Sequence, residues 1–219
     1  MRTARRIIGV DESGKGDFFG PLVIAGCLAG SEDIAFLTEL GVRDSKKIAP
    51  KKLLSLDEML RSRLVHTVIV YLPEEYNRLY VRLKNLNKLL AIGHARCIEG
   101  VLNQKEADLA ISDKFGKEER LEDAMAELEC NIPIEQIVRG EAIPQVAAAS
   151  IIARAEFVRQ IDKLSSQCQM TIPKGASALV DEVGRHLVAE HGAEILSKVA
   201  KTHFKNYGRA MKPKLPLQL

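Results

Sequence analysis

Two adjacent acids, Asp11 and Glu12, lie between segments that read as buried strands, and they constrain the fold more than any other feature. Residues 7–10 before them form a short apolar run, typical of a buried strand. After the glycine-rich link at 14–16, residues 21–29 are apolar throughout, as in a sheet that helices cover on both faces. Neighbouring carboxylates in such a place do not all ionise unless a positive group lies among them. The sequence therefore predicts a binding site for a cation at the end of the first strand.

The rest of the chain alternates short apolar runs with segments of helical periodicity. Further strands are expected at 66–72, 108–112 and 135–138. Helices are expected at 50–64, 85–102, 119–129 and 145–164, with one or two more between 179 and 199. This order predicts an α/β fold, in which a mixed central β-sheet is flanked by α-helices and followed by additional C-terminal helices. We expect one domain over residues 1–211, helical from about 145, and a flexible tail at 212–219.

Composition excludes several other classes of protein. With 219 residues, 46% of them hydrophobic, the chain buries a core without the help of disulfides. Its four cysteines form no Cys-x-x-Cys pair, which argues against a zinc ribbon, a thioredoxin-like site and a disulfide scaffold. The net charge of +3 does not by itself indicate a nucleic-acid ligand. Because the sequence contains neither a signal peptide nor a long apolar stretch, we expect a cytoplasmic protein without a membrane partner.

Residues 9–17 (GVDESGKGD) partly match a phosphate-binding P-loop, but two features argue against that interpretation. The P-loop requires Ser or Thr at position 16, where this chain has Gly. The carboxylates of Asp11 and Glu12 would also repel a phosphate. A metal site uses these acids instead, and ligands that are all oxygen favour Mg²⁺ or Mn²⁺. Asp113 and Glu141 follow two other predicted strands and would complete the site, although each alone is more typical of a solvated turn or a helix cap.

Several motifs, taken in order, make the chain resemble the type 2 ribonucleases H. Residues 9–22 (GVDESGKGDFFGPL) look like that family's opening motif, and they are closest to ribonuclease HIII, since ribonuclease HII has Ala-Gly-Arg-Gly at 13–16. The further motifs are RDSKK at 43–47, YN at 76–77, the stretch 85–94, AASIIAR at 148–154, PKGAS at 173–177 and KTHF at 201–204. Ribonucleases HIII usually carry an N-terminal domain similar to the TATA-box-binding protein. We expect the catalytic domain without it, because only eight residues precede Gly9.

The resemblance implies a ribonuclease H-like fold and a specific chemistry. It implies an endoribonuclease that hydrolyses the RNA strand of RNA–DNA hybrids by two-metal-ion catalysis, giving 5′-phosphate and 3′-hydroxyl ends. The catalytic residues and metal ligands carried over are Asp11, Glu12, Asp113 and Glu141, which would hold two divalent ions, Mg²⁺ or Mn²⁺. In this hypothesis Asp11 bridges the ions. Glu12 and Asp113 complete one ligand shell, and Glu141 holds the ion on the side of the nucleophile.

Ten residues are candidates for contact with the nucleic acid: Ser13, Gly14, Lys15, Gly16, Ser45, Lys46, Lys47, Ser150, Arg154 and Lys174. The glycine loop at 14–16 would let the main chain approach a ribose 2′-hydroxyl, although it is equally compatible with a plain tight turn. The segment 45–47 offers phosphate contacts or forms a solvated face. Ser150 and Arg154 share a helix face and line the phosphate path or merely pack. Roles for Lys201 and His203 stay open.

Because the loop carries Lys15 rather than Arg, the resemblance favours cleavage within runs of ribonucleotides and weak action at a single embedded one. Two other functions are compatible with strand-end acids. One is a different metal nuclease of ribonuclease H-like fold, such as a resolvase or transposase core, and the other is a nucleic-acid-binding module without catalysis. We expect a monomer whose partner is the RNA–DNA hybrid. The motif at 214–217 is too poor to predict a clamp or another protein partner.

Overall fold

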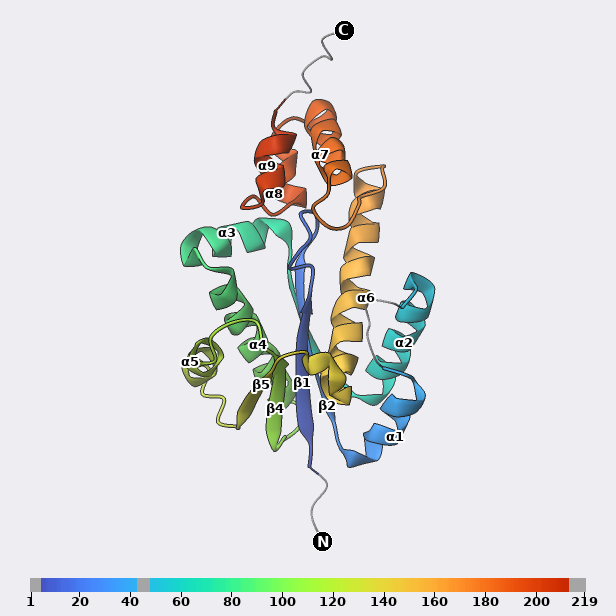
Figure 1. Ribbon diagram of the computed structural model, residues 1–219, viewed down its shortest axis with the longest axis vertical. Coiled ribbons are helices and arrows are strands. Elements are labelled where there is room, and N and C mark those ends of the chain that lie inside the picture. Colours follow the sequence, from blue (N-terminus) through green and yellow to red (C-terminus); the bar gives the residue numbers. More distant parts are fainter. Residues whose placement is uncertain (1–4, 43–47, 213–219) are drawn as a thin grey trace. The chain divides into compact units, whose positions relative to one another are not determined.

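The computed structural model describes residues 5–42 and 48–212. The predicted contacts Ser45, Lys46 and Lys47, and residues 213–219 of the predicted tail, lie outside the described residues. Five strands form one sheet in the order β3-β2-β1-β4-β5 (Figure 1). The strands are β1 (Ile7–Ser13), β2 (Leu22–Ala29), β3 (Val65–Tyr71), β4 (Leu109–Asp113) and β5 (Ile134–Ile137). β1 is antiparallel to β2 and parallel to β4, and β4 is parallel to β5, so the predicted mixed sheet is confirmed.

Helices occupy most of the remaining described chain. They are α1 (Ser31–Glu39), α2 (Pro50–Arg63), α3 (Pro73–Leu83), α4 (Leu86–Leu102), α5 (Glu119–Glu127), the 3-10 turn η2 (Gly140–Ala142), α6 (Pro144–Gln167), α7 (Ala178–His191), α8 (Ile195–Val199) and α9 (Lys205–Ala210). The helices expected between 50 and 199 are confirmed. α1, α3 and α9 were not expected from the sequence. α1 buries a single residue, Leu37, so it lacks the apolar stripe from which a helix is recognised.

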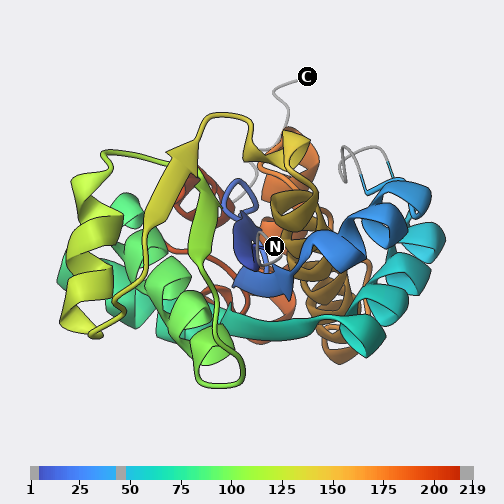
Figure 2. The same cartoon turned by 90° about the horizontal axis from the view of Figure 1, so that it is seen from below.

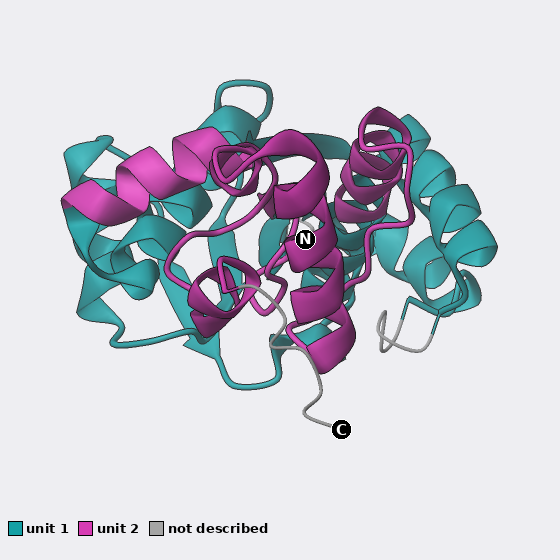
Figure 3. Cartoon of the chain, turned by 90° about the horizontal axis from the view of Figure 1, so that it is seen from above, with its two compact units in different colours: residues 1–13, 23–70, 83–156 teal, residues 14–22, 71–82, 157–219 magenta. Residues whose placement is uncertain are grey.

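The chain divides into two compact units (Figure 3). Unit 1 comprises residues 1–13, 23–70 and 83–156, and unit 2 comprises residues 14–22, 71–82 and 157–219. Unit 1 holds the sheet, apart from the end residues Leu22 and Tyr71, and unit 2 is mainly helical. The expectation of one domain over 1–211 stays a prediction.

In unit 1, helices cover both faces of the sheet, as the apolar character of β2 predicts. Every residue of β2 is buried, and Figure 2 shows α4 and α5 on one side of the sheet, with α1 and α2 on the other. Two glycines mark where helices approach most closely. A Cβ at Gly9 would lie 2.1 Å from the main-chain carbon of Gln145 in α6, and one at Gly26 would lie 3.3 Å from Cβ of Cys97 in α4. Because Gly9 pairs with Cys27, next to Gly26, the two helices lie on opposite faces.

Unit 2 is built around the segment 14–22, which follows β1 directly. Phe19 forms an isolated bridge with Ala200, and Asn77 of α3 donates to the carbonyls of Ser197 and Ala200. α7 packs on α9 so closely that a Cβ at Gly184 would lie 2.7 Å from Cβ of Ala210. Among the described helices of both units, none combines the length and the apolar character needed to cross a membrane.

Candidate active site

Asp11 and Glu12 lie within β1 and not after it. The strand continues to Ser13, with Asp11 opposite Ala25 and Glu12 opposite Ile24 on β2. Successive side chains of a strand point to opposite faces of the sheet, and the contacts of the two acids follow that rule. Asp11 is hydrogen-bonded to Ser150 of α6, and Glu12 contacts His94 of α4.

Asp11 lies in a strongly negative environment. Burial and the neighbouring Glu12 carboxylate raise its pKa from 3.8 to about 7, and Asp113 contributes in the same direction. Two hydrogen bonds oppose this shift, one from the Ser150 side chain and one from the Glu12 main-chain N–H, which lies 2.8 Å from Oδ1 of Asp11. A cation near Asp11 would favour its charged form and oppose this shift.

Asp113 and Glu141 come from the strands beside β1. The parallel register pairs Val10 with Ser112, so Asp113 lies next to Asp11 along the sheet. The Gly140 N–H donates to Oδ1 of Asp113 at 2.8 Å, and a Cβ at Gly140 would lie only 3.2 Å from Cα of Asp113. Glu141 follows in the turn η2 and is partly buried. The topology therefore places the segment that carries Glu141 against the strand that carries Asp113.

His94 of α4 contacts Glu12 and Ser112 on one face of the sheet, and sequence reasoning missed it. Its ring is fully buried, with Nε2 3.2 Å from Oε2 of Glu12 and Nδ1 2.9 Å from Oγ of Ser112. The Ser112 hydroxyl in turn donates to the main-chain carbonyl of Asp113 at 2.9 Å. The signal in the sequence was a lone polar residue on the buried stripe of α4, between Leu90 and Ile98.

The four predicted acids have the chemistry of a hard-cation site. All of their donor atoms are carboxylate oxygens, and the charges of Glu12 and Asp113 add to the effect of burial in raising the pKa of Asp11. Within residues 5–42 and 48–212, however, no three His, Cys, Asp or Glu side chains are grouped closely enough to hold a metal ion as they stand. Glu12 is turned toward His94, and Asp113 toward the Gly140 N–H. Binding of ions here requires the carboxylates to reorient.

The other predicted contacts fall in both units. In unit 1, Ser13 ends β1, and Ser150 is buried with its hydroxyl on Asp11. Arg154 lies one helical turn further on, and its buried Nη1 has no hydrogen-bond partner among the residues that the structure describes. Contact of these three residues with nucleic acid stays a prediction.

In unit 2, the glycine loop has one position that demands glycine and one that is open. Gly14 has φ +87°, and a Cβ there would lie 2.3 Å from the Pro21 carbonyl oxygen, so glycine is required. Gly16 is exposed, with no atom within 4 Å of a Cβ placed on it. Lys15 between them is partly buried, and Lys174 is exposed. The open position is where a ligand can approach the main chain.

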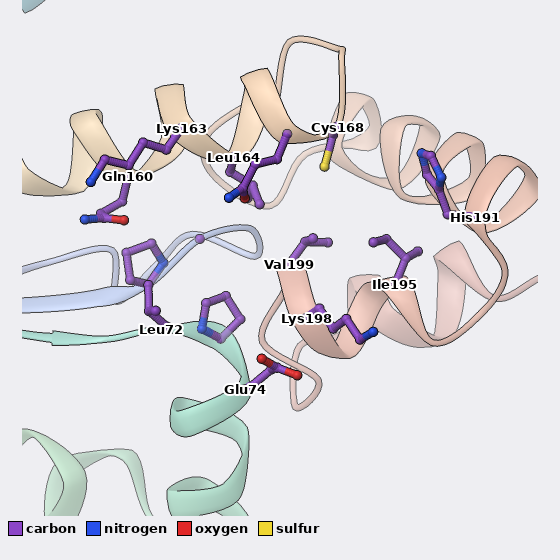
Figure 4. A pocket seen from close by; sticks show the side chains of 14 residues that line it. Leu72, Glu74, Gln160, Lys163, Leu164, Cys168, His191, Ile195, Lys198 and Val199 are labelled. Carbon is purple, nitrogen blue, oxygen red and sulfur yellow. The ribbon is translucent and has the colours of Figure 1, made fainter.

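A pocket in unit 2 is separate in its lining from the four acids (Figure 4). It is lined by apolar side chains, among them Leu164 and Ile195, together with the ammonium-bearing Lys163 and Lys198. Of the predicted catalytic and nucleic-acid-binding residues that the structure describes, none contributes to it.

Comparison with known proteins identifies the family. The sequence model of the family described as Ribonuclease HII matches residues 8–207. Ribonuclease HIII of Chlamydia pneumoniae is 45% identical over 203 residues, which cover 91% of this chain and 68% of that protein. Ribonuclease HIII of Chlamydia trachomatis serovar L2 is 43% identical over 210 residues, 94% of this chain and 70% of that one.

Solved structures agree with this result. The crystal structure of Bst-RNase HIII in complex with Mn²⁺ matches with a TM-score of 0.88 and 31% identity, over 94% of this chain and 69% of that chain. The Aquifex aeolicus RNase H3 structure matches with a TM-score of 0.77 and 28% identity, over 91% of this chain and 72% of that chain. The chain therefore belongs to the ribonuclease HII family of endonucleases, which cleave the RNA strand of RNA–DNA hybrids, and the resemblance to ribonuclease HIII is confirmed.

Proposed function

We propose that this chain hydrolyses the RNA strand of RNA–DNA hybrids with two divalent ions, Mg²⁺ or Mn²⁺, held by Asp11, Glu12, Asp113 and Glu141. The observation that carries the proposal is the raised pKa of Asp11, which lies among carboxylates of two neighbouring strands. A cation beside such a group would favour its charged form. The Mn²⁺ complex of the Bst enzyme supports a divalent ion as that partner.

The residues around the acids orient them for this task. Ser150 and the Glu12 N–H hold Asp11, the Gly140 N–H holds Asp113, and His94 holds Glu12. A carboxylate offers about four acceptor sites, so these bonds leave capacity for ions. Groups that orient metal ligands in this way commonly change metal affinity or activity by about 10–100-fold.

When bound, two divalent ions would lower the pKa of an attacking water and neutralise charge on the phosphate and on the departing ribose oxygen. Departure of the 3′-oxygen would leave 3′-hydroxyl and 5′-phosphate ends. The part of the protein in this step is electrostatic, because the acids supply the negative charge that concentrates the ions at the edge of the sheet.

Recognition of RNA is assigned to the glycine loop at 14–16. The open space beside Gly16 supports close approach of a ribose to the main chain. Lys15 and Lys174 would neutralise phosphates, as would Arg154, whose Nη1 lacks a hydrogen-bond partner in the described chain. The Lys in the loop favours cleavage within runs of ribonucleotides over cleavage at a single one.

The decisive experiment compares labelled substrates of one sequence: an RNA–DNA hybrid, a DNA duplex, a DNA four-way junction and a DNA duplex with one ribonucleotide. We expect cleavage of the hybrid with Mg²⁺ or Mn²⁺, products with 5′-phosphate by mass spectrometry, and loss of cleavage in EDTA. Weak cleavage at the single ribonucleotide is expected. Cleavage of the junction in preference to the hybrid, or cleavage that survives EDTA, would overturn the proposal.

A further inference from the structure

Lys201 of unit 2 is a lysine without exposed surface, and its ammonium group meets main-chain carbonyls instead of a carboxylate. Its exposed fraction is 0%. Nζ donates to the carbonyl oxygens of Asp17 and Gly20, both at 2.8 Å. It also lies 5.6 Å from the centroid of the Tyr76 ring, within the range of a cation–π contact. Lysine is almost never fully buried unless its charge is compensated, so this position calls for an explanation.

The two carbonyls belong to the segment that begins with the glycine loop. Gly14–Lys15–Gly16 is followed by Asp17, then by two buried phenylalanines, then by Gly20, so Lys201 holds the segment at both sides of the phenylalanine pair. Its own main-chain N–H donates to the carbonyl of the first of them, Phe18, at 2.8 Å. One residue therefore makes hydrogen bonds to three of the four consecutive residues 17–20.

The other hydrogen bonds of this segment that pack it in unit 2 use its N–H groups and the Asp17 carboxylate, and not the carbonyls of Asp17 and Gly20. The Phe18 N–H donates to the Gly175 carbonyl at 2.9 Å, and the Gly20 N–H donates to Val199 at 2.9 Å. The Asp17 side chain accepts from the Gly175 N–H at 2.6 Å. These bonds fix the N–H groups and the carboxylate. A buried carbonyl left without a donor costs about 1–3 kcal/mol in general, so an apolar residue of similar size at 201 does not replace the lysine.

Burial has a measurable effect on this ammonium group. It lowers the pKa of Lys201 from 10.5 to about 7, and the charge of Asp17 opposes the shift. A position that served only to fill space would be occupied more favourably by methionine or leucine.

We propose that Lys201 is the positioning residue of the glycine loop, and that its ammonium group holds the main chain of residues 14–20 in the form that reads the RNA sugar. Lys201 itself does not touch the substrate. This inference rests on the proposed function, in which the glycine loop recognises the 2′-hydroxyl, and it assigns discrimination between RNA and DNA to a buried residue about 180 positions further along the chain.

The test uses K201M, which keeps the length of the side chain and removes the donors, and K201R, which keeps the charge but replaces the compact ammonium group with a larger, planar guanidinium. The matched control is K205M, at an exposed lysine of α9. Each is made with and without D11N, so that binding is measured in a chain that does not cleave. Fluorescence anisotropy gives the affinities for an RNA–DNA hybrid and a DNA duplex of one sequence. Calorimetry gives the affinity for Mn²⁺.

We expect K201M to bind the hybrid about tenfold more weakly and to lose most of its preference over the DNA duplex. KM should rise with little change in kcat, and Mn²⁺ affinity should be unchanged. K201R should not restore the preference, and K205M should behave as the parent chain. A folded K201M with an unchanged preference for the hybrid would overturn the inference.

If K201M does not fold, K201Q decides, because glutamine keeps a polar amide at this position but is shorter and lacks the charged ammonium group. A loss of hybrid preference in K201Q with unchanged Mn²⁺ affinity supports the inference. Unchanged preference in a folded K201Q overturns it. If the parent chain itself does not distinguish hybrid from DNA duplex, the proposed function has failed and not the role of Lys201.

Discussion

Asp11 in unit 1 and Lys201 in unit 2 are both ionisable groups that burial shifts to a pKa of about 7, from opposite directions. Their surroundings differ in kind. The ammonium group of Lys201 meets two carbonyl oxygens and an aromatic ring. Asp11 has some donors, yet Glu12 and Asp113 beside it are negative and raise its pKa further.

The two sites therefore differ in what surrounds the charged group, which is hydrogen-bond acceptors at Lys201 and other carboxylates at Asp11. The ammonium group of Lys201 has main-chain acceptors, so it can hold main chain even though burial disfavours its charge. At Asp11 the neighbouring carboxylates add to the effect of burial, and a cation, as in the proposed function, would offset both. The predictions below test that contrast, beginning with the largest expected effect.

Replacing Asp11 by Asn should abolish cleavage of the hybrid, by more than about a thousandfold. The substitution keeps the shape of the side chain and the hydrogen-bonding neighbours but removes the charge that faces both adjacent acids. Initial rates with Mg²⁺ and with Mn²⁺ measure the loss. D162N, at an exposed aspartate of α6, is the control and should cleave normally. A D11N chain with parent-like rates would remove Asp11 from the catalytic set.

Adding one methyl group at a packed glycine should destabilise the protein more in unit 1 than in unit 2. In unit 1, G9A places a Cβ 2.1 Å from the main chain of Gln145, which has no flexible end to move aside. In unit 2, G184A places one 2.7 Å from Cβ of Ala210, at the edge of the short helix α9. We expect a loss of about 3 kcal/mol for G9A and about 1 kcal/mol for G184A in urea unfolding. The reverse order would contradict the greater rigidity that we assign to the contact of α6 with β1.

The strands and the longest helices of this fold were predictable, because their apolar patterns are local. The buried run of β2 and the stripe of α4 are visible in sequence, and both are where they were expected. α3 was missed because its buried surface is small and it is stabilised by Asn77, whose partners are more than a hundred residues away. Such partners leave no periodic trace in the sequence.

Which segments carry the four acids was predictable from the sequence, their geometry was not, and their joint role stays a prediction. Asp11 and Glu12 were expected at the end of the first strand, whereas β2 pairs with β1 through Ser13 and places them within the strand, on opposite faces of the sheet. The length of β1 depends on its pairing with β2, and a motif within one strand contains no information about that pairing. His94 was overlooked for the same reason, since its function depends on β1 and β4.

Replacing His94 by Gln should weaken Mn²⁺ binding by about 10–100-fold, because Glu12 loses the ring that orients it. Calorimetry with Mn²⁺ in the absence of substrate measures the effect without reference to activity. H186Q, at an exposed histidine of α7, controls for loss of a surface histidine and should bind Mn²⁺ normally. Unchanged Mn²⁺ affinity in a folded H94Q would mean that Glu12 does not depend on His94.

The smallest expected effects concern the stability of the metal-free chain as pH changes, and they should have opposite signs in the two units. The pKa of Asp11 is raised from 3.8 to about 7, so its contribution to stability is complete below 3.8 and is lost as the pH rises through about 7. The pKa of Lys201 is lowered from 10.5 to about 7, so its contribution is complete above 10.5 and is lost as the pH falls through about 7.

Urea unfolding in EDTA, for D11N and K201M beside the parent chain, measures these contributions. Relative to the parent, D11N should gain about 1–2 kcal/mol as the pH rises from about 5 to 8, since the parent alone acquires a charge among acids. K201M should gain a similar amount relative to the parent as the pH falls from about 9 to 6, since the parent alone acquires a buried cation. If the unfolding free energy relative to the parent changed with pH in the same direction for both variants, the two sites would not differ in the sign of the charge that burial disfavours.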